Sequence, residues 1–116
     1  MRHRHTIPTL DRNRDARQAL LRGLATNLVL RDKIRTTTAK AKAVKPIVER
    51  LVTIAKTNNL TARRRLVAYL YTDGAVRKML EVIGPRYTDR SGGYTRIIKT
   101  GPRKGDGGDT AILEFV

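Results

Sequence analysis

The chain has 116 residues, and its 25 lysines and arginines against 10 aspartates and glutamates give a formal net charge of +15. So basic a chain is unlike an ordinary near-neutral enzyme, and it predicts a polyanionic partner. The absence of cysteine excludes disulfides, thiolate catalysis and cysteine-ligated metal centres. Arginine outnumbers lysine 17 to 8. Because guanidinium binds phosphate bidentately and stacks on bases, this ratio favours RNA or DNA over an anionic lipid surface.

Length and hydropathy predict one folded unit, residues 13–116, preceded by a basic arm, residues 1–12. No stretch is long and apolar enough to span a membrane, and no apolar segment follows the basic start, Met1 to His5. We therefore expect a soluble intracellular protein with no membrane partner.

Apolar residues at helical spacing predict a first helix from about Asn13. Its apolar side carries Ala16, Leu20, Leu24 and Leu28, widened by Leu21 and Ala25. The alternating, β-branched residues 33–37 predict a strand. Three more helices should follow, each starting at a residue that can cap a helix N-terminus. They are a helix from Thr37 or Thr38 to about Lys56, one from Thr61, and one from Asp73 that stops at Gly84-Pro85.

The C-terminal third is rich in β-formers, and residues 94–100 and 110–116 predict an antiparallel hairpin around a Gly-rich loop. With the earlier strand, these segments indicate an α+β fold. We expect a small mixed sheet, covered on one face by about four helices.

The most specific segment is Gly84-Pro-Arg-Tyr-Thr-Asp-Arg-Ser-Gly-Gly-Tyr-Thr-Arg96. Glycines let a backbone approach phosphate closely, and its three arginines supply charge. Tyr87 and Tyr94 could stack on exposed bases. The plain alternative is a turn with two packed tyrosines. Because three arginines around one turn would otherwise repel each other, we favour RNA contact. We also expect at least one of the adjacent glycines, Gly92 and Gly93, to have a positive φ.

Other basic sites are more ambiguous. Arg63, Arg64 and Arg65 span 200° of a helix, so at most two share a face, and a solvated surface explains them nearly as well as phosphate contact. Lys40 and Lys42 lie where helix N-terminal amides would favour phosphate.

Catalytic groups are scarce. His3 and His5 have no nearby carboxylate to orient them, and the loop from Gly101 to Asp109 lacks the Gly-Lys-Ser/Thr ending of a nucleotide-binding loop. Asp106 and Asp109 are too few for a cation site. We therefore expect no enzymatic activity, no cofactor, no metal and no small-molecule substrate.

The ordered motifs resemble one family, the bacterial-type large-subunit ribosomal protein seventeen family. They cover essentially the whole chain and are Met1-Arg-His-Arg4, Leu10-x-Arg12, Ile34-x-Thr-Thr37, Lys40-Ala-Lys42, Leu51-Val-Thr-Ile-Ala-Lys56, Arg63-Arg64, Gly84 to Ile98, Arg103-x-Gly-Asp106 and Ala111-x-Leu-Glu-Phe115. The resemblance implies an α+β domain and a structural role in stabilising 23S ribosomal RNA beside other large-subunit proteins.

Taken together, the residues and the resemblance give a set of RNA-binding candidates. They are Arg2, His3, Arg4, Arg12, Arg14, Arg17, Lys40, Lys42, Arg63, Arg64, Arg86, Arg90, Gly92, Gly93, Tyr94, Arg96, Lys99 and Arg103. Two alternatives remain open at this point. One is a nucleic-acid-binding regulator in which the helices of residues 61–83 imitate a helix-turn-helix, and the other is an RNA-processing enzyme using His3 and His5. With no transit peptide visible, we expect the cytoplasm, although the sequence does not distinguish a bacterial from an organellar ribosome.

Overall fold

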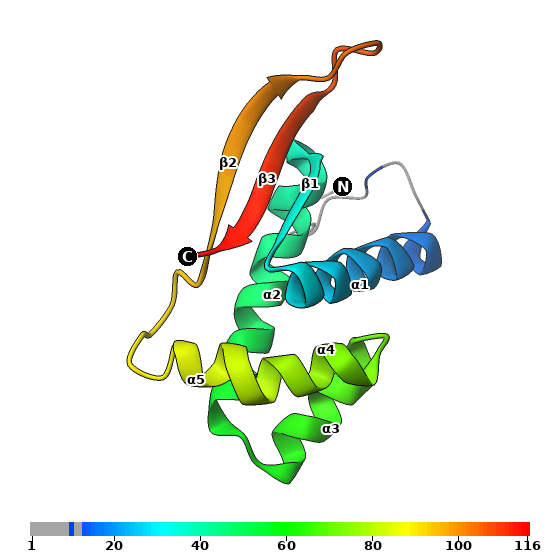
Figure 1. Ribbon diagram of the computed structural model, residues 1–116. Coiled ribbons are helices and arrows are strands. Elements are labelled where there is room, and N and C mark those ends of the chain that lie inside the picture. The colour runs from blue at the N-terminus through cyan, green and yellow to red at the C-terminus, as the bar shows by residue number, and fades with distance from the viewer. Residues whose placement is uncertain (1–9, 11–12) are drawn as a thin grey trace, which may run out of the picture.

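The structure is a computed structural model that describes residue 10 and residues 13–116. Figure 1 shows a sheet at one end, a group of short helices at the other, and the helix α2 running between them. The elements are α1 Arg14–Arg31, β1 Lys33–Thr37, α2 Thr38–Thr57, α3 Leu60–Tyr69, α4 Asp73–Lys78, a π-helical turn Met79–Ile83, α5 Gly84–Arg86, β2 Thr95–Pro102 and β3 Asp109–Phe115.

Side-chain caps set where the helices begin. The residues Asn13, Thr37, Asn59 and Thr72 each accept a hydrogen bond from the backbone N–H three positions later. The predicted starts of α1 and α2 are confirmed. The caps predicted at Thr61 and Asp73 are wrong, because Asn59 and Thr72 already hold the extended backbone from which a cap accepts.

The apolar side of α1 is largely as predicted. Leu21, Ala25 and Leu28 are buried, together with Val29, but Ala16 is exposed. Ala16 lies in the first turn of the helix, outside the buried core. Leu10, which belongs to the predicted arm, also packs against the core.

The predicted helix stop at Gly84-Pro85 is wrong, because helical structure continues through these residues to Arg86. In the π turn, the N–H of Gly84 bonds to the carbonyl of Met79, five residues back. In a regular α-helix the ring of Pro85 would collide with the backbone carbonyl four residues earlier. The wider turn just before Pro85 changes the hydrogen-bond register there. A Cβ on Gly84 would also lie 3.0 Å from the carbonyl oxygen of Ala55 on α2, so glycine allows the two helices to approach.

The α+β class is confirmed, but the predicted mixed sheet is corrected. Both strand pairs are antiparallel. The strand order is β1-β3-β2, so the last strand in the sequence lies between the other two. Helix α2 packs against all three strands and α1 against β1, whereas α3 packs on α2, α4 packs on α1, and α3 and α4 pack on each other. Inward-facing Ile34, Leu113 and Ile97 line up across the sheet.

Candidate nucleic-acid interface

Helix α2 holds the turn that leads into β2. One carboxylate oxygen of Glu49 accepts hydrogen bonds from the N–H (2.8 Å) and hydroxyl (2.7 Å) of Thr95, and the other accepts from the N–H of Tyr94 (3.2 Å). Burial opposes ionisation of Glu49, but these hydrogen bonds outweigh it and leave its pKa below the ordinary value. The turn is therefore fixed to the helical core rather than free.

The two tyrosines of this turn are packed side chains. Tyr94 is 1% exposed, Tyr87 is also buried, and their ring centroids lie 5.2 Å apart. The Tyr87 hydroxyl donates to the carbonyl of Val116 (2.7 Å), and the Tyr94 hydroxyl accepts from Lys56 (3.0 Å). That second bond lowers the pKa of Tyr94. Base stacking by Tyr87 and Tyr94 was therefore a wrong prediction, because both side chains are buried in the core.

Around these buried rings, Arg86, Arg90 and Arg96 are exposed. Gly93 has φ +63°, which confirms the prediction of a glycine at positive φ, whereas Gly92 does not. Arg90 donates to the carbonyl of Gly92 (3.2 Å), so its side chain lies along the turn.

Arg86 and Arg96 each have an acidic neighbour. The guanidinium of Arg86 lies 4.0 Å from Asp32, and that of Arg96 lies 2.7 Å from Glu114. The Arg96 side chain is still 60% exposed, so one nitrogen is paired while the rest of the fork faces solvent. The long Arg86–Asp32 pair is weak, and a phosphate can replace it. A phosphate can share Arg96 with Glu114, whose side chain is only 19% exposed.

A groove of about 570 Å³ lies between β1 and the hairpin tip and is lined by Arg35, Thr36, Pro102, Arg103, Lys104 and Thr110. Arg103 is less available than predicted, because Asp106 binds it with two hydrogen bonds that also hold the Asp106 pKa far below its ordinary range. Lys99 is exposed on β2. Arg35 was not among the candidates, although it is exposed between the half-buried Ile34 and Thr36 in the predicted strand.

The helical candidates lie on three separate helices. Arg14 and Arg17 are in the first turns of α1, Lys42 is exposed near the start of α2, and Lys40 is half-buried beside it. Arg63 and Arg64 are exposed on α3. The predicted sites Arg2, His3, Arg4 and Arg12, with His5, lie outside the described residues.

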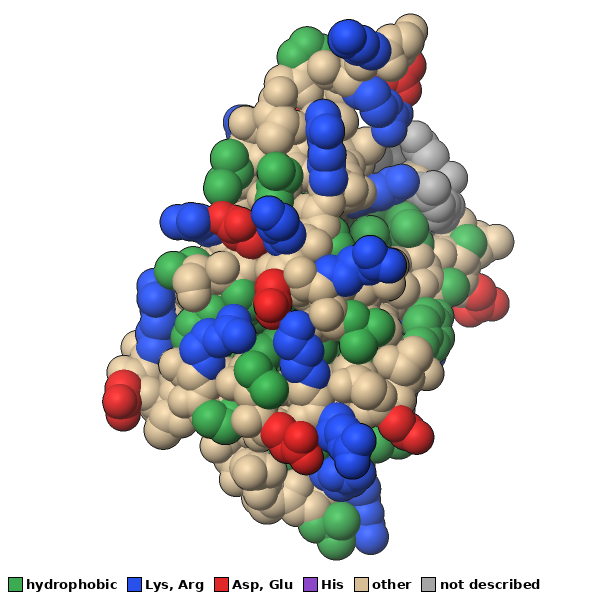
Figure 2. Space-filling view, viewed as in Figure 1, with side chains coloured by type: hydrophobic (Ala, Val, Ile, Leu, Met, Phe, Trp, Pro, Cys, Tyr) green, Lys and Arg blue, Asp and Glu red, His purple; other side chains and the backbone are tan. Residues whose placement is uncertain are grey.

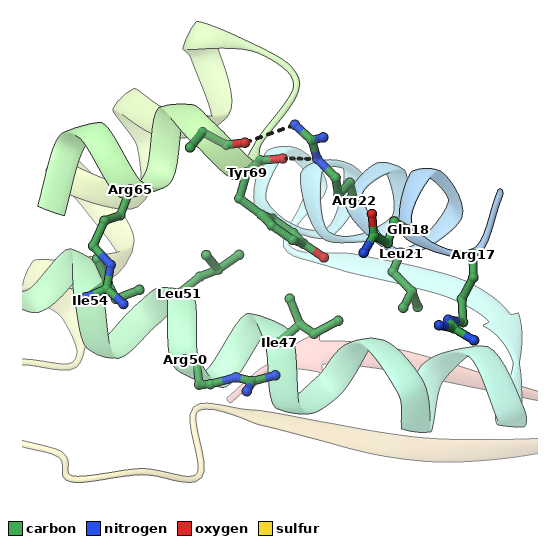
Figure 3. A pocket seen from close by; sticks show the side chains of 11 residues that line it. Arg17, Gln18, Leu21, Arg22, Ile47, Arg50, Leu51, Ile54, Arg65 and Tyr69 are labelled. Atoms are coloured by element: carbon green, nitrogen blue, oxygen red, sulfur yellow. Dashed lines mark hydrogen bonds between the residues drawn. The ribbon is translucent and has the colours of Figure 1, made fainter. Parts of the chain in front are cut away.

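A second groove, of about 500 Å³, lies between α1, α2 and α3, and sequence reasoning did not predict it. We call it the arginine groove. Its lining is Arg17, Gln18, Leu21, Arg22, Ile47, Arg50, Leu51, Ile54, Arg65, Ala68 and Tyr69. Figure 3 shows Leu21, Ile47 and Leu51 pointing into the space beside Tyr69, with arginines around it. The sequence signal was an apolar stripe at 47, 51 and 54 on α2, interrupted by Arg50.

Among the charged side chains on the surface visible in Figure 2, basic ones are more frequent than acidic ones. Figure 2 shows lysines and arginines from the hairpin tip to the helical end, with fewer acidic side chains between them. In the part of the chain that the structure describes, no group of three metal-ligating side chains comes together. None of the helices described could cross a membrane.

A family model described as ribosomal protein L17 matches residues 20–116 of this chain. The chain belongs to that family. Three relatives are each named large ribosomal subunit protein bL17. That of Koribacter versatilis is 49% identical over 116 residues, covering 100% of this chain and 72% of the relative. That of Carboxydothermus hydrogenoformans is 49% identical over 107 residues (92% and 96%), and that of Symbiobacterium thermophilum is 51% identical over 107 residues (92% and 95%).

Family membership confirms the resemblance deduced from the motifs and makes the chain a bacterial-type protein of the large ribosomal subunit. The family is one of ribosomal proteins and not of enzymes, so the non-catalytic prediction is also confirmed. The regulator and RNA-processing alternatives are therefore set aside.

Proposed function

We propose that this chain stabilises the 23S ribosomal RNA in the bacterial cytoplasm, beside neighbouring large-subunit proteins and without a cofactor. Residues 13–116 act as one RNA-binding unit, and residues 1–12 act as a basic arm. The supporting observation is the placement of charge: exposed cations lie on the turn before β2, on the hairpin and on α1, α2 and α3, while the core beneath them is apolar. Separate basic surfaces on a small core suit contact with several RNA segments.

The proposed contacts are the sequence candidates without Tyr94, whose buried ring supports the turn instead. They are Arg2, His3, Arg4, Arg12, Arg14, Arg17, Lys40, Lys42, Arg63, Arg64, Arg86, Arg90, Gly92, Gly93, Arg96, Lys99 and Arg103. In this proposal Gly92 and Gly93 bring the backbone close to the sugar-phosphate chain, and the arginines neutralise its charge.

Salt dependence tests the proposal. If about eight phosphates are neutralised, log K for a purified 23S rRNA fragment should fall with log[salt] at a slope of about −6 to −7. A slope shallower than −2 would refute electrostatic binding over several surfaces. Association with the ribosome is checked separately, because the protein should remain in salt-washed large subunits.

Arg96→Ala tests one proposed contact. It should weaken binding and make the salt slope less steep by about 0.7–0.9, with little change in melting temperature, because an exposed arginine on a strand contributes little to stability. Arg77→Ala is the matched control, since it also removes an exposed arginine paired with a glutamate, here Glu81 at 4.0 Å, outside the proposed contacts. Equal effects of the two variants would contradict a specific role for Arg96.

A further inference from the structure

The arginine groove combines an apolar floor with a rim of one charge. Leu21 and Leu51 are buried at its base, and Ile47 and Ile54 are half-buried, so aliphatic surface remains open to a ligand. The rim holds Arg17, Arg22, Arg50 and Arg65, and none of the lining residues is acidic. A ligand that fits must therefore have both an apolar face and negative charge.

One of the four arginines is part of the scaffold. Arg22 donates to the backbone carbonyls of Tyr69 (2.8 Å) and Ala68 (3.1 Å), and its guanidinium lies 5.6 Å from the Tyr69 ring centroid and 4.7 Å from that of Tyr71. Figure 3 shows these two hydrogen bonds joining α1 to the end of α3. Arg22 thus holds Tyr69 at the groove.

The other three arginines are available. The guanidinium groups of Arg17, Arg50 and Arg65 have no hydrogen bond or ion pair to any other residue that the structure describes. They come from α1, α2 and α3 respectively, so they approach the groove from different sides. Three like charges around one hollow repel each other, and an anion would relieve that repulsion.

We propose that the arginine groove receives one unstacked nucleotide of the ribosomal RNA, with its base against Tyr69 and the aliphatic floor and its flanking phosphates at Arg17, Arg50 and Arg65. Unstacked bases bind to aromatic rings and guanidinium planes in this way. Gln18 offers an amide donor and acceptor for the edge of the base. This inference rests on the proposed function and adds a specific subsite to it.

Two observations favour RNA over an acidic protein segment. All four cations are arginines, although the chain also has eight lysines, and only guanidinium stacks on bases as well as binding phosphate. The groove also shares Arg17 with the basic first turns of α1, which are already proposed to contact RNA. Its volume of about 500 Å³ lies in the range of sites that enclose a molecule of nucleotide size.

The absence of native cysteine allows a direct test. Ile47→Cys, carrying an azidophenyl photocrosslinker on its thiol, is assembled into large subunits and irradiated. We expect a crosslink to one short stretch of 23S rRNA. The control is Leu60→Cys with the same reagent, because Leu60 is 62% exposed on α3 but does not line the groove. The control should not mark the same nucleotides.

Unlabelled variants provide a second measurement if the label prevents assembly. Arg50→Ala and Arg65→Ala should each lower affinity for 23S rRNA about three- to ten-fold and expose one base to chemical modification in assembled subunits. The control Arg31→Ala removes the same charge from the end of α1, outside the groove.

A crosslink from position 47 to a protein, or no crosslink to RNA, overturns the inference. The inference also fails if Arg50→Ala and Arg65→Ala both leave the pattern of chemical modification of the rRNA unchanged. If the salt slope stays at about −6 to −7 in that case, the proposed function stands without this subsite. If the slope is shallow as well, both fail.

Discussion

Glu49→Gln tests how strongly α2 holds the turn before β2. The substitution keeps the size of the side chain but removes its charge. It also replaces one acceptor oxygen by an NH2 group, which cannot accept the hydrogen bonds that Tyr94 and Thr95 donate. Three hydrogen bonds to the carboxylate are affected. Hydrogen bonds to charged groups contribute about 1.5–3 kcal/mol each when buried. Because Glu49 is only half-buried and one oxygen remains as an acceptor, we expect a total loss of about 2 kcal/mol.

Urea and thermal unfolding followed by circular dichroism measure this loss. About 2 kcal/mol corresponds to a fall in melting temperature of roughly 8 °C for a chain of this size. The control is Glu81→Gln, since Glu81 is exposed and lies 4.0 Å from Arg77 in a single ion pair. The control should change stability by less than about 0.5 kcal/mol.

The pH dependence gives an independent check. The folded-state pKa of Glu49 is lower than the ordinary 4.5, so its ionised form stabilises the fold above that pH, and the stabilisation is lost as the pH falls through the folded-state pKa. The stability difference between the wild type and Glu49→Gln should therefore shrink below pH 4.5. A variant as stable as the wild type at pH 7, or a difference that does not depend on pH, would refute the reasoning.

Three further predictions concern glycines and the arm. Gly93→Val places a β-branched residue at φ +63° and should cost about 1–3 kcal/mol in chemical unfolding, whereas Gly92→Ala should be nearly neutral. Gly84→Ala would set a methyl group 3.0 Å from two carbonyl oxygens and should lower the melting temperature, and unchanged stability would contradict the close packing of α5 on α2. Deleting residues 2–9 should weaken RNA binding in a filter assay with the melting temperature nearly unchanged; equal affinity would contradict a contact there.

Local signals made much of the fold predictable. Asn13 and Thr37 cap helices because their side chains and backbones act within three residues, and the alternation of residues 33–37 needs no distant partner. The order of the strands was not predictable in this way. Nothing within β3 itself specifies that it pairs with β1 on one side and with β2 on the other.

The candidate site was harder to predict for a related reason. Charge is visible in a sequence, so the exposed arginines around Gly93 could be identified, but burial depends on the whole fold. Tyr94 resembles a base-stacking residue until α2 and the C-terminal strand are placed around it. The arginine groove joins residues 17 to 69 from three helices, and no local pattern reports that they meet.

The central position of β3 also has a consequence for biosynthesis. Strands β1 and β2 both take their hydrogen bonds from β3, which is the last of the described elements to leave a translating ribosome. Until then neither strand has its neighbour, while the helices can already form local hydrogen bonds. We therefore expect the helical half to fold first during synthesis and the sheet to close only after β3 has emerged, so that nascent chains arrested before residue 109 expose two unpaired, basic strands.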